Sequence, residues 1–542
     1  MYINEFFNDC ELLRIVNVKL QMEGLKSGYG IRVVTPSPDH TFELDEKMLS
    51  ELLLRDDVKD RAVVVLSVAG PFRKGKSFLL DFFLRYLQQT YNIKDGSDWL
   101  GAEDVPLSGF SWRGGSDRDT TGLLLWSQPF FATLANGQKV VIFLMDTQGT
   151  FDSESTVKDN ATVFALSTML SSVQIYNLSQ NIEEDDLQHL QLFTDYGRLA
   201  QQNITGKPFQ QLQLLVRDWS FPYEYAYGAK GGSELLEKRL EVHEDQHEEL
   251  KSIRRHIAAC FEKLTCFLMP HPGLNVATNP KFDGKLADIS PDFKTSLREL
   301  VPLMLAPENL LLKKIAGQEL KAKDLLFYFK AYMNIFNGDD LPQPKSILAA
   351  TAEANNLSAV SDARDVYETL MEEVVGGNQP YMDPTRLEEQ HQRAKNKALH
   401  AFHSKRKMGG DDLEATYMEK LTKELEENYE QYRAHNEGKN LFRMVGTPTL
   451  LAALALLGFL VSFVGSTLGV QTVVALGQII AVGALVLLGF WTYTRASGNM
   501  RDVGQQIDRV ADVIRTHLTR QLLGAATNQL APSLGLSRDK QA

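Results

Sequence analysis

The sequence predicts an α/β domain with a mostly parallel sheet and helices on both faces, then an all-α three-helix bundle and a two-segment membrane hairpin. Three observations lead to this prediction. Apolar runs alternate with helical patterns in the first part of the chain, which indicates a parallel sheet covered by helices. Glycine pairs separate charged helical patterns in the middle, and a long stretch near the C-terminus carries no charge.

Length and charge limit the kinds of protein this chain can be. Its 542 residues are too many for one ordinary domain. It has 57 basic and 69 acidic residues, a net charge of -12, whereas a nucleic-acid partner needs a basic face to replace counterions. We therefore expect no nucleic-acid partner. The three cysteines, Cys10, Cys260 and Cys266, form neither a disulfide framework nor a zinc spacing.

Four apolar runs in the first part of the chain predict buried strands. Residues 62–69 and 140–145 are continuous and rich in β-branched residues, which suits strands buried on both faces. Residues 212–216 and 266–269 are shorter runs of the same kind. An amphipathic segment at 77–88 follows the first strand and predicts a helix.

A polar stretch with glycine and proline at 337–344 predicts a domain boundary. Three charged helical patterns follow, and Gly376-Gly377 and Gly409-Gly410 between them suit helix ends and tight turns. Short connections predict antiparallel packing of the three helices. The expected organisation is a nucleotide-binding domain at 1–337, a linker at 338–345, the bundle at 346–440, a hairpin at 446–494 and a tail at 495–542.

The stretch from Met444 to Thr494 contains no charged residue. A membrane span needs about 20 residues to cross about 30 Å of hydrocarbon, and 449–468 and 473–494 each provide that length. Because Arg443 and Arg495 flank the pair, both ends are expected to face the cytosol. The alternative is a helix pair buried in a soluble domain, but no neighbouring segment offers enough apolar surface to enclose it.

The tail beyond the hairpin shows an amphipathic helical pattern. Apolar residues recur there at spacings of three and four: Val503, Ile507, Val510, Ile514, Leu518 and Leu522. A membrane-surface helix and a helix that docks on the bundle or on another copy both fit this pattern.

Residues 70–77 match G-x-x-x-x-G-K-[ST], between a predicted buried strand and a predicted helix. The backbone N–H groups of such a loop, helped by the positive end of the helix, bind the β-phosphate. Lys76 would reach the β- and γ-phosphates and Ser77 would bind Mg²⁺. This part of the sequence therefore predicts a P-loop domain that binds a nucleoside triphosphate.

Two further segments complete the predicted phosphate site. Asp146-Thr147-Gln148-Gly149 ends a strand, where the aspartate can hold Mg²⁺ and the glycine N–H can contact the γ-phosphate. Residues 112–122 are polar and glycine-rich, and a threonine there would complete the Mg²⁺ shell; Thr120 is the first choice and Thr121 the second. Ser77, Thr120 and Asp146 are thus the candidate metal ligands, although an ordinary turn and a surface loop would also fit these patterns.

The guanine-reading Asn-Lys-x-Asp is absent from the chain, and Arg217-Asp218 follows the third strand. Asp218 could accept hydrogen bonds from guanine N1–H and N2–H₂, which adenine cannot offer. An Arg-Asp pair also occurs as a surface ion pair, but ligands of open α/β sheets bind at the carboxyl ends of strands.

Together these motifs resemble the atlastins, dynamin-superfamily proteins close to the guanylate-binding proteins. The resemblance covers essentially the whole chain and includes 217–222 and the loop at 271–275. It implies a GTPase that dimerises in trans and joins endoplasmic reticulum membranes, with Arg73 as an arginine finger supplied in cis. Arg73 and Thr120 are the candidate catalytic residues. The loop 271–279 would cap the base. One departure from the family pattern is Pro71, where alanine is expected. Small GTPases place a glutamine after Asp-x-x-Gly, whereas this chain has Thr150.

The site predicted from the motifs and the resemblance is larger than the phosphate loop. Its candidate nucleotide-binding residues are Gly70, Arg73, Lys74, Gly75, Lys76, Ser77, Phe78, Arg113, Thr120, Gln148, Gly149, Arg217, Asp218, Val276 and Asn279. Two other functions stay open: a nucleotide-gated membrane tether or shaping scaffold without fusion activity, and an ATPase built on the same loop.

Overall fold

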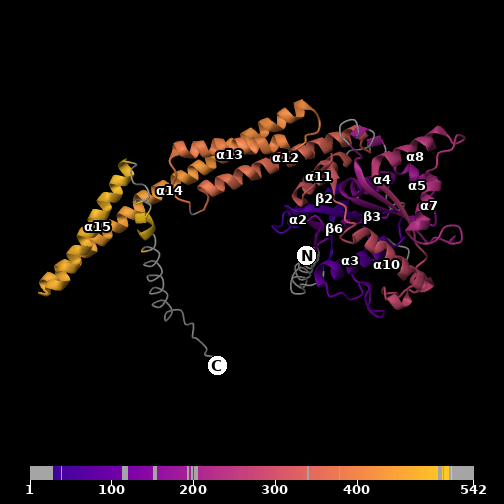
Figure 1. Cartoon of the computed structure of the whole chain (residues 1–542), viewed down its shortest axis with the longest axis horizontal. Coiled ribbons are helices and arrows are strands. Elements are labelled where there is room, and N and C mark those ends of the chain that lie inside the picture. The colour runs from indigo at the N-terminus through magenta and orange to yellow at the C-terminus, as the bar shows by residue number, and fades with distance from the viewer. Residues whose placement is uncertain are drawn as a thin grey trace, which may run out of the picture. The chain divides into compact units, whose positions relative to one another are not determined.

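The structure is a computed structural model of the chain (Figure 1). The described residues are 28–37, 39–112, 120–149, 156–191, 195–196, 199–200, 206–337, 341–377, 379–497, 503, 506–511 and 514. Arg113 lies outside them. The chain divides into two compact units, Met1–Asp362 with Phe402–Glu419 and Ala363–Ala401 with Lys420–Ala542, and each is described by itself. The domain boundaries given above stay predictions.

A nine-stranded sheet organises the first unit, in the order β2-β1-β4-β6-β3-β7-β8-β9, with β5 also paired to β6. The central strands β6, β3, β7, β8 and β9 pair in parallel, and β1, β2, β4 and β5 pair antiparallel. The strands are β1 Gly30–Pro36, β2 Phe42–Leu44, β3 Ala62–Ala69, β4 Leu123–Trp126, β5 Phe130–Thr133, β6 Lys139–Thr147, β7 Val173–Ser179, β8 Phe209–Arg217 and β9 Phe261–Leu268; β10 Lys314–Ile315 and β11 Gln318–Glu319 pair separately. The predicted mostly parallel sheet is confirmed.

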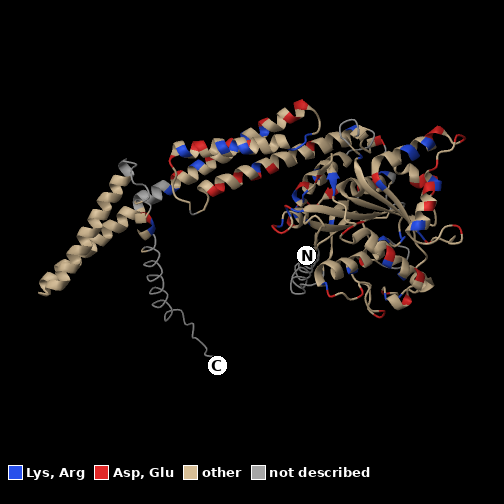
Figure 2. Cartoon of the chain, viewed as in Figure 1, with Lys and Arg blue, Asp and Glu red and all other residues tan. Residues whose placement is uncertain are grey.

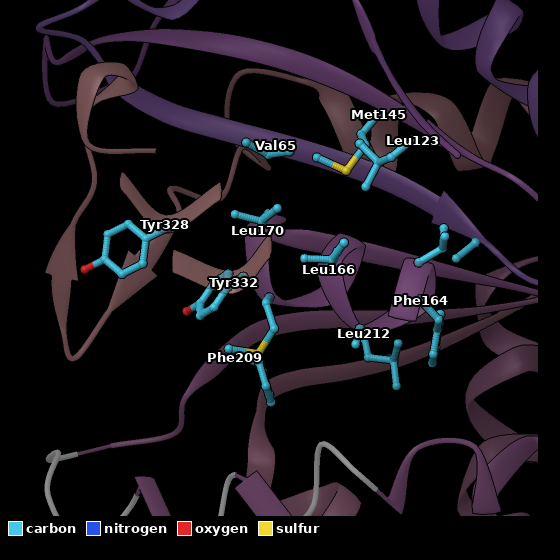
Figure 3. Packing of buried hydrophobic residues seen from close by; sticks show 14 of the residues in the cluster. Val65, Leu123, Met145, Phe164, Leu166, Leu170, Phe209, Leu212, Tyr328 and Tyr332 are labelled. Atoms are coloured by element: carbon cyan, nitrogen blue, oxygen red, sulfur yellow. The ribbon is translucent and has the colours of Figure 1, made fainter. Parts of the chain in front are cut away.

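Helices cover both faces of this sheet. They are α2 Glu46–Leu53, α3 Lys76–Leu87, η1 Gln88–Ile93, α4 Val157–Leu170, α5 Glu184–Gln188, α7 Ala229–Leu240, α8 Glu248–Cys260, α9 Leu274–Thr278, η2 Leu286–Asp288, α10 Pro291–Leu305 and α11 Ala322–Phe336. Alternate residues of β3 enter two cores: Val63 and Val65 pack with α2, α4 and α11, whereas Val64 and Leu66 pack with α3 and α10. Figure 3 shows Val65 in the first core with Leu170 of α4 and Tyr332 of α11. Burial on both faces explains the continuous apolar run of this strand.

Lys313 is a lysine buried in the first unit without a described carboxylate partner. Its side chain is 1% exposed, and Nζ donates to the carbonyl oxygen of Ser171 at 2.9 Å. Burial lowers the pKa of Lys313 to about 7 because the charged form is poorly solvated there. Below pH 7 both the folded and the unfolded chain carry the proton, and above that pH the folded chain releases it first.

Unfolding should therefore depend on pH through Lys313. Between pH 7 and the usual lysine range, the unfolded state binds more protons, so the free energy of unfolding should rise with pH by up to about 1.4 kcal/mol per unit. Lys313→Met should remove this rise, and Lys314→Met, a change at a partly exposed neighbour, should keep it. Urea titrations of the detergent-solubilised chain from pH 7 to 9.5 test this, and parallel curves for the wild type and Lys313→Met would contradict it.

Long helices form the rest of the chain: α12 Pro344–Val375, α13 Pro384–Ser404, α14 Asp411–Thr467 and α15 Gln471–Ser497. In the second unit, Tyr367 bonds His391 Nδ1 at 2.8 Å, and the His391 ring stacks on Tyr429 at 4.1 Å between centroids. These contacts join α12, α13 and α14 and confirm the predicted helical part. α14 is a single helix from Asp411 to Thr467 that includes a charged segment and the first apolar span. Figure 2 shows that the hairpin helices carry almost no coloured charges, unlike the helices of the bundle.

Two helical segments are long and apolar enough to cross a membrane, Gly446–Thr467 and Gln471–Thr494. They pack closely through glycines: a Cβ added to Gly458 would lie 2.6 Å from Ala481 N, and one added to Gly477 would lie 2.5 Å from Ser462 N. Small residues let membrane helices approach at backbone distance. Large apolar side chains such as Phe463 (69% exposed) and Val486 (64% exposed) point away from the pair. This arrangement fits the predicted hairpin.

The described residues of the tail lie against the base of this hairpin. The Asp508 carboxylate is buried and accepts hydrogen bonds from Thr447 Oγ1 at 2.8 Å and Trp491 Nε1 at 2.9 Å. Val503 and Ile514 line an apolar cavity of about 430 Å³ together with residues of α14 and α15. The sequence predicted that the tail helix lies on the membrane surface or docks on the bundle or on another copy. Neither prediction included this contact with the two apolar spans.

Candidate functional site

The phosphate loop leaves β3 and enters α3 under tight backbone constraints. Gly70 has φ 141°, and a Cβ there would lie 2.2 Å from the carbonyl oxygen of Asn177. Gly75 has φ 70° and caps α3, which begins at Lys76. Only glycine tolerates both the close approach and these angles without strain. The N–H groups in the first turn of α3 lie at the end of the loop, where the start of a helix stabilises an anion.

Three predicted metal ligands come together beside this loop. Ser77 Oγ donates to Asp146 Oδ2 at 2.5 Å, and Thr120 Oγ1 lies 3.1 Å from Ser77 Oγ and 3.4 Å from Asp146 Oδ2. Asp146 is fully buried, and its Oδ1 has no hydrogen-bond partner among the described residues. Burial raises the pKa of Asp146 to about 6, although the bond from Ser77 and the charge of Lys76 lower it. One carboxylate and two hydroxyls form an oxygen set that suits Mg²⁺.

The turn after β6 touches both the phosphate loop and the chain that follows Thr120. Gln148 N donates to Gly122 O, and Gly122 N donates to Gln148 Oε1, each at 2.8 Å. A Cβ on Gly149 would lie 2.4 Å from Phe72 Cα and 3.0 Å from Lys76 Nζ. Glycine at 149 therefore lets the turn lie directly against the loop. Gln148 holds the neighbouring segment through its side chain.

Two lysines and an arginine of the loop differ in their surroundings. Lys76 is 6% exposed, and its Nζ donates to the carbonyl oxygen of Pro71 at 3.2 Å. Lys74 contributes its carbonyl oxygen to a bond from Asn177 Nδ2 at 3.1 Å. Arg73 is exposed, has φ 59°, and places its guanidinium 5.6 Å from the Phe72 ring centre. A positive φ is uncommon for a residue other than glycine.

Arg217, at the end of β8, contacts the underside of the phosphate loop. It is 3% exposed, and its NH1 donates to the carbonyl oxygens of Lys74 at 3.3 Å and Gly75 at 3.4 Å. The guanidinium also lies 5.4 Å from the Phe293 ring centre. Burial lowers the pKa of Arg217. In this arrangement the Arg217 side chain supports the loop.

Asp218 and the segment after β9 lie at the carboxyl ends of neighbouring parallel strands. Asp218 is half-buried with φ 58°, a backbone angle that Asp and Asn adopt more readily than most residues. Val276 lies on α9 and packs partly buried against the core around α3 and α10. Asn279 is exposed, and its Oδ1 accepts a bond from Lys281 N at 2.9 Å. This edge of the sheet is where ligands of α/β folds bind.

Two residues of this region differ from the sequence prediction. Asn177 was not identified as a site residue, and Phe78 was predicted to bind the nucleotide but its ring does not lie free to do so. Asn177 on β7 is fully buried, and besides donating to Lys74 O it accepts from Arg217 NH1 at 3.4 Å. The available signal was a pair of polar residues, Gln174 and Asn177, within a mostly apolar segment. Phe78 is 6% exposed, and its ring packs among Phe82, Trp112, Phe282 and Phe293, so only its backbone is left to face a phosphate.

Comparisons with known proteins agree with this geometry. The family model described as guanylate-binding protein, N-terminal domain, matches residues 39–314, and that for the guanylate-binding protein C-terminal domain matches residues 316–441. Atlastin of Drosophila melanogaster is 57% identical over 487 residues, which cover 90% of this chain and 90% of that protein. Atlastin-2 of Homo sapiens is 53% identical over 490 residues, with 90% and 83% covered. Atlastin-1 of Bos taurus is 50% identical over 489 residues, with 90% and 87% covered.

These matches span both the phosphate-binding unit and the helical part, and the two apolar helices add a membrane segment. They confirm the expected resemblance and the GTPase fold. The chain belongs to the atlastin family, dynamin-superfamily GTPases that hydrolyse GTP and carry transmembrane helices.

Proposed function

We propose that this protein fuses endoplasmic reticulum membranes with one another. GTP binding dimerises its catalytic domains across two facing bilayers, and movement of the helical bundle about the linker at 338–345 draws the two hairpins together. The tail helix then perturbs the lipid headgroups. Both ends of the chain face the cytosol, in accord with Arg443 before the hairpin and Arg495 after it. The organelle follows from the resemblance to the atlastins.

The observation that supports this most is the continuity of α14. One helix, Asp411–Thr467, contains both the charged segment that packs on α12 and α13 and the first membrane span. A continuous helix has no loop in which a displacement of the bundle would be lost. A force applied to the bundle would therefore act directly on the lipid-embedded segment.

Hydrolysis uses the groups around the phosphate loop. Ser77, Thr120 and Asp146 would hold Mg²⁺, which neutralises charge on the β- and γ-phosphates when bound. Lys76 binds the same phosphates, and Arg73 turns inward in the dimer to stabilise the charge that develops on the transferred phosphoryl group. Gly149 N–H contacts the γ-phosphate. Asp218 accepts from guanine N1–H and N2–H₂, while Val276 and Asn279 cover the base.

Lys76→Ala separates fusion from the alternative of a tether or shaping scaffold. The variant loses the charge that binds the phosphates, so we expect GTP hydrolysis and lipid mixing between reconstituted vesicles both to fall to background. Lipid dequenching measures mixing, and electron microscopy of the same vesicles measures tubulation. Lys47→Ala, at an exposed position in α2, is the matched control. GTP-dependent mixing by Lys76→Ala would contradict the proposal, and tubule shaping that persists in this variant would favour the shaping scaffold.

A further inference from the structure

Asp81 is a buried carboxylate on the phosphate-loop helix that none of the roles above uses. It lies one helical turn after Ser77 on α3 and is fully buried. Its Oδ1 accepts from Phe110 N at 2.7 Å, and its Oδ2 accepts from Trp112 Nε1 at 2.8 Å. A Cβ on Gly109 would lie 2.3 Å from Asp81 Oδ1, so the chain at 109–112 lies directly on this side chain.

The carboxylate fixes the orientation of the Trp112 ring. That ring packs edge-on against Phe78, at 5.3 Å between centroids and 75° between planes. It also lies 5.7 Å from the Phe282 ring, which is 5.9 Å from Phe78. Trp112 therefore lies between the first turn of α3 and the segment that follows α9.

Phe282 connects this cluster to the proposed base-covering residues. Its N–H donates to Asn279 O at 3.1 Å, which ties the ring position to the end of the segment Val276–Asn279. A bond from Leu107 N to Asp283 O at 3.0 Å joins the stretch that precedes Trp112 to the residue that follows Phe282. The contacts thus run from Asp81 through Trp112 to Phe282 and Asn279.

We infer that Asp81 is a positioning residue for nucleotide binding, which acts by holding Trp112 and, through Phe282, the segment that covers the guanine base. The inference rests on the proposed contacts of Val276 and Asn279 with the base. Asp81 therefore affects how tightly the nucleotide binds and not the rate of phosphoryl transfer, because the contacts of Asp81 lead to the base end of the site.

Asp81→Asn tests the inference because it changes hydrogen bonding with little change in volume. The carboxylate accepts from Phe110 N and Trp112 Nε1 with two oxygens, whereas the amide has only one acceptor oxygen. One of these two N–H donors would therefore face the amide NH₂. We expect the Kd for fluorescently labelled GDP and the KM for GTP to rise roughly tenfold, with kcat changed less than about twofold. Trp112→Phe keeps the ring packing but removes one donor, and it should weaken GDP binding by a smaller factor.

The double variant D81N/W112F gives the decisive comparison. Without the indole N–H, the amide oxygen can accept from Phe110 N and the amide NH₂ meets no donor, so binding should be tighter than in D81N alone. Asp57→Asn, an exposed aspartate paired with Arg55, is the control for the same chemical change. An unchanged Kd in both D81N and W112F, or a double variant no tighter than D81N, would overturn the inference. If Val276→Asp binds GDP with the same Kd as the wild type, that result would instead count against the proposed base contacts.

Discussion

Replacing Arg73 with alanine is expected to lower kcat for GTP hydrolysis by about 10³-fold or more, with the KM for GTP changed far less. An arginine that stabilises the transferred phosphoryl group contributes about 10³–10⁵ in kcat. Arg73 is exposed, and the proposed contact with the transferred phosphoryl group forms only when its side chain turns inward in the dimer. The effect should therefore appear in turnover and not in binding.

Single-turnover phosphate release with the reconstituted protein measures this prediction. Arg73→Lys should recover little of the lost rate, because an ammonium lacks the planar fork that binds two oxygens at once. Arg55→Ala, which removes an exposed arginine paired with Asp57, is the matched control. A decrease in kcat below about tenfold for Arg73→Ala would show that another group stabilises the transition state.

Asp218→Asn is expected to lower kcat/KM for GTP by about 10²-fold or more and to raise it for xanthosine triphosphate. A site built to accept two N–H donors rejects a ligand that leaves those polar groups unpaired. The amide supplies a donor for the xanthine carbonyl in place of the lost acceptor. Because Asn adopts a positive φ as readily as Asp, the backbone at φ 58° should not change.

Competition of unlabelled nucleotides against labelled GDP measures the change in base preference. The wild type should prefer guanosine over xanthosine and adenosine nucleotides, and the variant should prefer xanthosine. Ser220→Ala, which removes a side chain bonded to the carbonyl oxygen of Asp218 but not to its carboxylate, is a local control. An unchanged order of preference in Asp218→Asn would place base recognition elsewhere, and tight ATP binding by the wild type would support the ATPase alternative.

The central strand and helix of the fold were predictable because their patterns are strong. β3 has the predicted bounds, and α3 begins and ends one residue before the predicted segment. β7 was missed because Gln174 and Asn177 interrupt its apolar run. Both are buried, and their amides find partners inside the sheet, with Gln174 Nε2 donating to Ile175 O at 3.3 Å and Asn177 bonding the phosphate loop. Such tertiary contacts leave no periodic pattern in the sequence.

The candidate site was predictable to the extent that it follows local motifs. Ser77, Thr120 and Asp146 meet as the motifs suggest because they follow strands or loops at one edge of the sheet. The direction of the Arg217 side chain was not predictable, since it depends on carbonyl oxygens of Lys74 and Gly75 that are far away in sequence. The same holds for Asp81 and Trp112, whose contact joins a helix to a loop with no sequence motif.

Two vesicle populations carrying the full-length protein provide the most direct test of the link between the nucleotide site and the membrane hairpin. One population is labelled with a quenched lipid dye, and dequenching is followed after GTP is added. Lipid mixing is expected only when both populations carry the protein and GTP is hydrolysed. Mixing without GTP, or with protein in one population alone, would contradict it.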